Sequence, residues 1–190
     1  MFVIGWLVRA VIVWILTIMG LFIVPIALLF PNGGTSVSDG RPIIVLPDWA
    51  WLWSNDFDGA SGDKRGWWNE HAPFGLGSKH FLSKFWWLAI RNPVNNLRRT
   101  RLFSCPVSKC YIDFVGQREV ADKPGLTGWQ FVTAEHERTE QTWHGFYGVW
   151  PWGQGRALVV RLGFKIHPAH EGTKEQPKGF CFRINPWKKI

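Results

Sequence analysis

Six histidines are the residues of this chain best suited to binding a metal. His167 and His170 stand three positions apart just beyond a predicted strand, and His136 and His144 flank a predicted turn. Two imidazoles that face each other can share a zinc ion, but a structural or catalytic zinc site needs at least three protein ligands. Histidines at strand ends are most often surface residues, so we predict neither a metal site nor another cofactor.

Nucleophilic and acid–base chemistry has equally little support. Glu70 and His71 are adjacent and could act as an acid–base pair. Cys105 could act as a nucleophile only with a distant histidine as its base. The three cysteines are an odd number, which excludes a complete disulfide framework, although Cys105 and Cys110 are close enough in sequence to pair. The chain contains no Gly-x-Ser-x-Gly, no phosphate-binding loop and no His-Glu-x-x-His motif. We therefore predict no catalytic residue.

A polar loop over residues 55–63 resembles a calcium-binding loop in composition. The spacing of an EF-hand fails, because its sixth position is Ser61 rather than glycine and its twelfth is Trp67 rather than glutamate. A turn in which an Asn or Asp side chain caps the backbone is the preferred interpretation, and calcium is the weaker one.

Residues 10–30 form an uncharged apolar run, which is long enough as a helix to span the roughly 30 Å of a bilayer core. Arg9 stands where a long side chain can reach the lipid headgroups, and Trp6 suits the membrane interface at the same end. A cleaved signal peptide would have a shorter apolar core, and a buried soluble helix is rarely apolar all round. We predict a single-pass anchor in a bacterial inner membrane.

The orientation of this anchor is less clear. Arg9 precedes the run, and Arg41 is the only basic residue in the first twenty or so after it, which favours a cytoplasmic N-terminus and a periplasmic domain. Unpaired thiols and basic residues would suit the cytoplasm better, where thiols stay reduced and lipid is anionic. We prefer the periplasmic domain.

A second helix is predicted from Ser78 to the Asn92-Pro93 stop, with apolar residues at helical spacing. It lies in residues 71–109, which hold seven Lys or Arg and no acidic residue. This stretch therefore accounts for nearly all of the chain's net charge of +8. An aromatic helix beside clustered arginines is typical of an interfacial membrane helix. The predicted membrane-interface residues are Trp6, Arg9, Phe81, Phe85, Trp86, Trp87, Arg91, Arg98, Arg99 and Arg101.

Two alternatives remain for this basic helix. It could pack on its own domain with a solvated basic face. Basic residues with interleaved aromatics also bind single-stranded nucleic acid, but no fold-level nucleic-acid signature accompanies them here. We rank the lipid bilayer, and anionic lipid in particular, above nucleic acid as the partner.

From residue 107 onward the chain is predicted to form antiparallel strands. The clearest, over 156–167, alternates, which places Leu158, Val160, Leu162, Phe164 and Ile166 on one face that we predict to be the core. Further strands are expected over 111–118, 128–137, 142–152 and 179–185. The predicted fold is α+β: a transmembrane helix, an amphipathic Trp-rich helix, and a sheet of four or five strands as a meander or small open barrel.

The predicted segments are a transmembrane anchor (1–30), a Trp/Asp/Gly-rich connector (31–77), the basic helix with its linker (78–106) and the β domain (107–190). Within the connector, residues 48–53 alternate and suggest a short strand or an aromatic clamp. Fourteen tryptophans are far above ordinary usage, and tryptophan favours sites where one end of the side chain is apolar and the other is wet.

Four stretches of the chain are also distinctive: residues 62–68, 87–99, 161–166 and 184–187. On these motifs the chain resembles a family of small uncharacterised, membrane-associated proteins of tailed bacteriophages. The resemblance implies a phage origin and a role at the host envelope or in the virion, and it transfers no catalytic residue.

We therefore expect a phage-encoded, membrane-anchored, non-enzymatic binding or structural protein. It would act at the host inner membrane or as a virion component in genome delivery, with phage or host envelope proteins as partners. The alternative is a membrane-tethered enzyme that acts on envelope material, and the absence of a catalytic motif argues against it.

Overall fold

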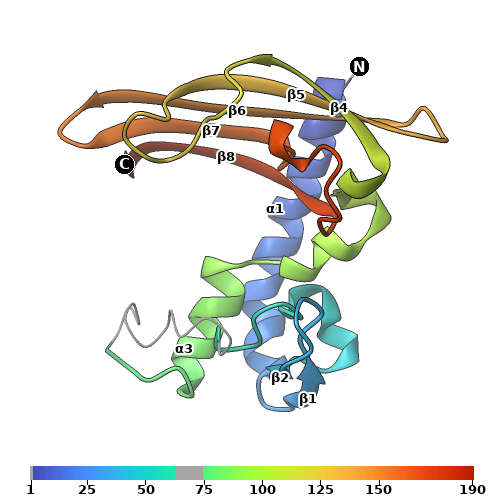
Figure 1. Ribbon diagram of the computed structural model, residues 1–190. Coiled ribbons are helices and arrows are strands. Elements are labelled where there is room, and N and C mark those ends of the chain that lie inside the picture. The colour runs from blue at the N-terminus through green and yellow to red at the C-terminus, as the bar shows by residue number, and fades with distance from the viewer. Residues whose placement is uncertain (1, 63–74) are drawn as a thin grey trace. The chain divides into compact units, whose positions relative to one another are not determined.

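The computed structural model describes residues 2–62 and 75–190 and has an α+β fold (Figure 1). It divides into two compact units. The sheet unit comprises Met1–Ala10 and Arg98–Ile190, and the helix unit comprises Val11–Leu97. The long apolar helix α1 (Phe2–Ala27) contributes its first turns to the sheet unit and the rest to the helix unit. The units thus cut across the segments expected from the sequence.

Five consecutive antiparallel strands build the sheet unit, at nearly the predicted positions. They are β4 (Cys110–Gly116), β5 (Gly128–His136), β6 (Thr142–Gly153), β7 (Arg156–Phe164) and β8 (Lys178–Lys189). The two-residue strand β3 (Ser104–Cys105) pairs with the start of β8, which gives the order β3-β8-β7-β6-β5-β4. The predicted meander is confirmed, but the open sheet has six strands rather than four or five.

Three short helical turns connect or follow these strands: η4 (Arg101–Phe103), η5 (Val107–Lys109) and η6 (Pro168–His170). Two apolar clusters form the core, one around Val132 and Trp143, which includes Val107 of η5, and one around Val149 and Val159. We call the side of the sheet that carries these clusters the inner sheet face.

The predicted core face of β7 is partly wrong. Phe164 and Ile166 are buried as expected, but Leu158, Val160 and Leu162 are only half-buried. In the first part of β7 the buried residues are instead the intervening ones, Ala157 and Val159. Buried positions change from odd to even between 159 and 164, where Gly163 adopts a φ of 81°. Such a backbone irregularity re-aims the side chains that follow it.

The opposite side, which we call the outer sheet face, is strongly apolar. The strand register places one row of large side chains across it: Val115, Phe131, Phe146, Leu162 and Phe182. The two ends of this row, Val115 and Phe182, are exposed. The ring of Phe2 of α1 packs against Phe131 in the middle of this row, so the row is open mainly at its ends.

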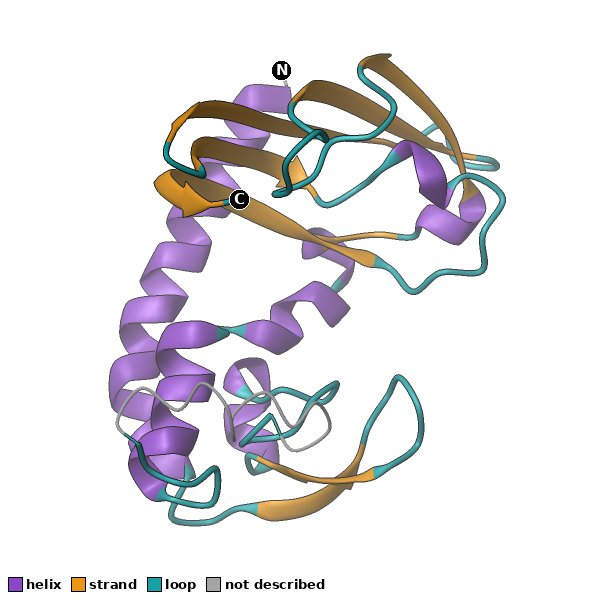
Figure 2. Ribbon diagram, turned by 60° about the vertical axis from the view of Figure 1, so that its left-hand side comes forward, coloured by secondary structure: helices purple, strands orange, loops and turns teal. Residues whose placement is uncertain are grey.

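The helix unit contains a small two-stranded sheet and several short helices. Its elements after α1 are β1 (Asn32–Thr35), β2 (Pro42–Val45), the 3₁₀ helix η1 (Asp48–Trp53), α3 (Phe81–Phe85), the π-helical turn η2 (Trp86–Arg91) and the 3₁₀ turn η3 (Asn95–Arg99), whose last two residues belong to the sheet unit. Figure 2 shows β1 and β2 as a separate pair of strands. Residues 48–53 are thus helical rather than the short strand that was one of the two expectations.

Polar side chains hold the centre of the helix unit. Asn96 is fully buried, donates from Nδ2 to the Trp51 carbonyl at 2.9 Å and accepts the Asp56 backbone N–H at 3.2 Å. Asn55 Oδ1 accepts the backbone N–H of Asp58 at 3.1 Å and the Asn95 side-chain amide at 2.7 Å. Asn55 thereby caps the turn, as the preferred interpretation of the polar loop expects.

Tryptophan side chains link these loops to the backbone. Trp53 Nε1 donates to the Leu16 carbonyl of α1 at 2.8 Å. The Trp53 ring packs directly on Gly20, where an added Cβ would lie only 2.6 Å from Trp53 Cδ1. Trp51 Nε1 donates to the Asp56 carboxylate at 2.9 Å. Several tryptophans are therefore structural residues with a satisfied indole N–H.

Candidate lipid-binding site

In the helix unit, α1 presents an exposed apolar face. The exposed residues recur every three or four positions: Val11, Ile15, Ile18, Phe22 and Ile26. We call this set the α1 strip. Across the helix, Val24 and Ala27 are completely buried. Among the described residues, α1 is the one helix long and apolar enough to cross a membrane.

The first turns of α1 pack inside the sheet unit. Trp6 is only 7% exposed, and its ring occupies the space beside Gly163, where a Cβ would be 2.5 Å from the indole. The ring of Phe2 lies 4.6 Å from that of His144 and 5.7 Å from that of Phe131. Trp6, one of the predicted membrane-interface residues, is thus packed inside the sheet unit.

The predicted basic helix divides its aromatic residues between core and surface. It begins at Phe81, which is exposed, while Phe85 and Trp86 are half-buried. Trp87 is only 5% exposed and donates from Nε1 to the Gly59 carbonyl at 3.1 Å. Trp87 therefore holds the helix unit together and is not available to lipid.

The four arginines predicted in the basic helix and its linker belong to two units. Arg91 lies at the end of η2 in the helix unit, and Arg98, Arg99 and Arg101 lie in the sheet unit. Arg91, Arg99 and Arg101 are exposed. Arg98 is half-buried, with its Cβ against Gly179 of β8.

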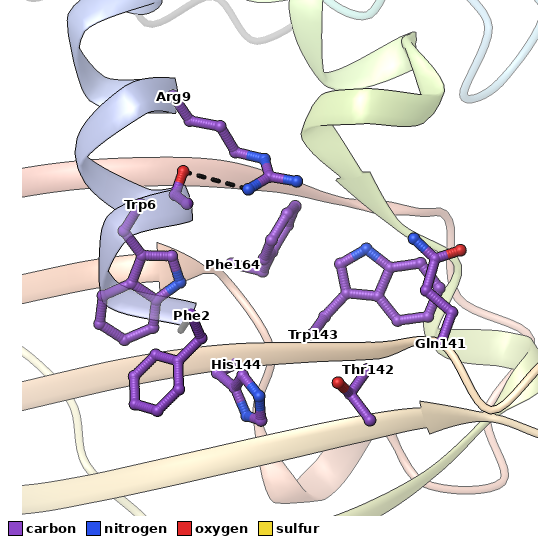
Figure 3. A pocket seen from close by; sticks show the side chains of 9 residues that line it. Phe2, Trp6, Arg9, Gln141, Thr142, Trp143, His144 and Phe164 are labelled. Atoms are coloured by element: carbon purple, nitrogen blue, oxygen red, sulfur yellow. Dashed lines mark hydrogen bonds between the residues drawn. The ribbon is translucent and has the colours of Figure 1, made fainter.

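A hollow of about 470 Å³ opens in the sheet unit beside the first turns of α1 (Figure 3). We call it the Arg9 pocket. Its lining residues are Phe2, Gly5, Trp6, Arg9, Gln141, Thr142, Trp143, His144 and Phe164. Aromatic rings form most of its walls, and none of the lining residues is acidic.

Arg9 is held in place at this pocket by the surrounding chain. Its Nε donates to the Leu102 carbonyl at 3.0 Å, and Nη1 donates to the Gly5 carbonyl at 3.1 Å. The guanidinium lies 5.6 Å from the centre of the Phe164 ring, within the range of a cation–π contact. Within the part of the chain that the structure describes, no carboxylate forms an ion pair with Arg9.

His144 adds a neutral polar group to the pocket. Its Nδ1 is 3.1 Å from Thr133 Oγ1, and its ring stacks on Phe131 at 5.7 Å. Burial lowers the pKa of His144 below its usual value, so the imidazole is neutral at pH 7. Arg9 is therefore the positive charge that lines this pocket.

A second hollow of about 280 Å³ shares two residues with the first. Trp143 and Gln141 line both, and the second is also lined by Arg99, Arg101, Ser104, Pro106, His136 and Thr139. The sequence prediction included the three arginines that line the two hollows, Arg9, Arg99 and Arg101. It missed Trp143, Gln141, Thr142 and Phe164. These residues carry no motif, and only the strand pairing brings them to the first turns of α1.

In a comparison with protein-family models, the chain matches a family of unknown function (DUF7338) over residues 1–190. The chain belongs to the DUF7338 family. No curated protein and no solved structure shows significant similarity to it. The family assignment covers both units of this DUF7338 protein and brings no activity with it.

The candidate nucleophile of this DUF7338 protein lies in an unfavourable environment. Cys105 is completely buried, and burial raises the pKa of its thiol, with the neighbouring Cys110 raising it further. A reactive cysteine instead needs a lowered pKa and access to solvent. The three cysteines are free thiols.

The candidate metal ligands are engaged in local structure. His167 Nδ1 accepts the Ala169 N–H at 3.1 Å, and His170 Nδ1 accepts the His167 N–H at 3.0 Å, so the pair caps η6. Within residues 2–62 and 75–190, no three His, Cys, Asp or Glu side chains gather as metal ligands. Glu70 and His71 lie outside the described residues.

Proposed function

We propose that this DUF7338 protein is a non-enzymatic binding or structural protein that attaches to a lipid bilayer through the α1 strip. The observation that carries the proposal is the exposure of five large apolar side chains along one face of one helix. Soluble proteins rarely expose a continuous apolar surface of this kind. Each of these side chains gains about 1.5–3 kcal/mol when it leaves water completely.

The chain connectivity favours a helix that lies in the membrane plane over the single-pass anchor. The chain leaves the sheet unit after Ala10 and returns to it at Arg98. A crossing by α1 would therefore require a second crossing before residue 98. The returning segment, residues 91–101, contains four arginines and three asparagines, which are costly in hydrocarbon.

Packing along α1 supports the same arrangement. Residues 2–10 belong to the sheet unit, and Trp53 contacts α1 from Leu16 onward. The stretch between these contacts, residues 11–15, rises only about 7.5 Å, against the roughly 30 Å of a bilayer core. An in-plane helix needs only one apolar face free. The predicted orientation, with the N-terminus and the C-terminal domain on opposite sides, is therefore not part of this proposal.

The resemblance to proteins of tailed bacteriophages supports a proposal about which membrane the protein attaches to. We propose the inner membrane of a bacterial host, or a virion component that meets this membrane during genome delivery. Envelope proteins of phage or host would be further partners. A membrane-tethered enzyme is the weaker alternative, because the described Cys105 is buried and the His167–His170 pair caps a helix.

Vesicle flotation of the full chain tests the attachment. The double variant Ile18→Asp/Phe22→Asp places two carboxylates in the α1 strip, at a cost of several kcal/mol in hydrocarbon. We expect its partitioning into vesicles to fall about tenfold or more. The matched control Asn32→Asp/Thr35→Asp adds the same charge on exposed β1 and should float like the wild type. Equal flotation of both variants would refute the α1 strip as the anchor.

Protease protection in spheroplasts separates the in-plane helix from the single-pass anchor. One protease-cleavable tag is placed before residue 1 and another in the turn between β1 and β2, at Asp39-Gly40. An in-plane helix leaves both tags on one side of the membrane, so both are cut or both are protected. Cleavage of one tag alone would establish a single crossing.

A further inference from the structure

The two hollows of the sheet unit form one cationic, aromatic surface. Trp143 and Gln141 line both hollows, with Arg9 on one side and Arg101 on the other. No aspartate or glutamate lines either hollow. The sheet unit as a whole also has more basic than acidic residues. This surface has the charge of an anion-binding site.

Arg9 has the fixed geometry that such a site needs. A guanidinium carries five N–H groups, and the carbonyls of Gly5 and Leu102 accept two of them. The other three can donate to an anion. Because two backbone bonds and the Phe164 ring already orient the side chain, little conformational entropy is lost on binding.

We propose that the Arg9 pocket binds a phosphate group, with Arg9 as its main ligand and the rings of Trp6 and Trp143 as apolar walls. A planar guanidinium pairs with two phosphate oxygens at once, which gives both strength and orientation. Thr142 and Gln141 at the rim supply further donors. Arg101 in the adjoining hollow adds a second positive charge for the rest of an anionic headgroup.

The phosphate has two possible sources, a free phosphate ion and the headgroup of an anionic phospholipid. The lipid source rests on the proposed membrane attachment, whereas the phosphate chemistry does not. A phospholipid would also use the apolar walls, which inorganic phosphate cannot contact productively. We therefore expect the lipid to bind more tightly than the ion.

Titration calorimetry on the full chain in neutral detergent micelles tests this site. The probes are dihexanoyl phosphatidylglycerol, dihexanoyl phosphatidylcholine and inorganic phosphate. We expect the anionic lipid to bind at least about tenfold more tightly than the zwitterionic one, because the pocket has no carboxylate to hold choline. Tighter binding of inorganic phosphate than of the anionic lipid would retain the phosphate site but reject the lipid source. Equal binding of both lipids would overturn the selectivity for an anionic headgroup, and the absence of binding by all three probes would overturn the phosphate site.

Matched variants locate the binding. Arg9→Gln should weaken binding of the anionic lipid about tenfold or more, and Arg183→Gln, on exposed β8 outside both hollows, should leave it unchanged. Equal effects of the two variants would refute the site. A measurement on the wild type guards against misfolding of Arg9→Gln: the Arg9 Nε–H resonance should shift saturably with the anionic lipid, and an unchanged resonance would overturn the site.

Failure of this site and failure of the proposed function give different results. Arg9→Gln retains the α1 strip and should still float with neutral vesicles. Loss of headgroup selectivity with retained flotation is the outcome expected for the pocket. Loss of flotation in Ile18→Asp/Phe22→Asp with retained selectivity in micelles is the outcome expected for the strip.

Discussion

The sheet unit and the helix unit differ in charge and in what holds them together. The sheet unit contains sixteen Lys and Arg against eight Asp and Glu, so all of the net charge of +8 belongs to it, while the helix unit has six of each. One unit is thus suited to anions, and the other presents a neutral surface with an apolar strip. The proposed attachment and the proposed headgroup recognition therefore rest on different units and can be tested separately.

Their interiors differ in the same way. The sheet unit closes over two apolar clusters, whereas buried asparagines organise the helix unit through directed hydrogen bonds. Apolar burial tolerates small shifts, but a buried amide needs its partners at fixed positions. The two units should consequently respond to different substitutions.

The largest effect is expected in the sheet core. Val149→Asp buries an unpaired carboxylate at a position that is 0% exposed and should cost on the order of 3–5 kcal/mol, enough to unfold the sheet unit. Val115→Asp makes the same change at a position that is 60% exposed on the outer sheet face and should cost less than about 1 kcal/mol. Urea unfolding and hydrogen exchange over β4–β8 measure both. Similar costs for the two variants would show that the assignment of the inner and outer sheet faces is wrong.

A smaller effect is expected in the polar core of the helix unit. Asn96→Leu keeps roughly the same side-chain volume but removes the hydrogen bonds that Asn96 makes with the Trp51 carbonyl and the Asp56 N–H, at about 2–3 kcal/mol. Asn32→Leu, on exposed β1, is the control. Hydrogen exchange should quicken in the helix unit and stay slow in β4–β8. Unchanged exchange around Trp51 in Asn96→Leu would contradict the polar core.

The smallest effect is a pH dependence in the sheet unit. Burial, aided by Lys178, lowers the pKa of His170 to about 4, so the folded state prefers the neutral imidazole. The contribution of His170 to the stability of the folded state is fully present above the unfolded pKa of about 6.5. It is lost as the pH falls from there toward 4. His170→Gln should reduce this slope by at most about one proton. Burial also lowers the pKa values of His144 and His167, so the stability of the variant keeps a residual dependence on pH. An unchanged slope in the variant would exclude His170 as a contributor.

Local patterns predicted the strands well, because alternation and turn residues act over a few positions. The strand over 156–167 was found, yet its core face was partly misassigned, since the positive φ of Gly163 cannot be read from alternation. The helix after Ser78 was also found, but it begins at Phe81 with His80 as its N-cap. Its buried residues depend on contacts such as Trp87 with Gly59, which are 28 positions apart.

The candidate site was predictable only in part. The length and lack of charge of residues 10–30 suffice to indicate an apolar helix. Which face of it stays exposed depends on Trp53 and Gly20, whose contact is not visible in the spacing. The Arg9 pocket was missed for the same reason, because Trp143 reaches it through strand pairing that begins more than a hundred positions after α1.

The distance in sequence between Arg9 and its acceptor Leu102 sets an order of events during synthesis. The two residues are 93 positions apart, which at roughly 5–20 residues per second separates their synthesis by about 5–20 s. Until the strands have been made, the first turns of α1 lack the sheet that later buries Trp6. Under the proposed attachment, a nearby membrane would capture the helix before the strands exist, and the sheet unit would then fold onto a segment that is already attached.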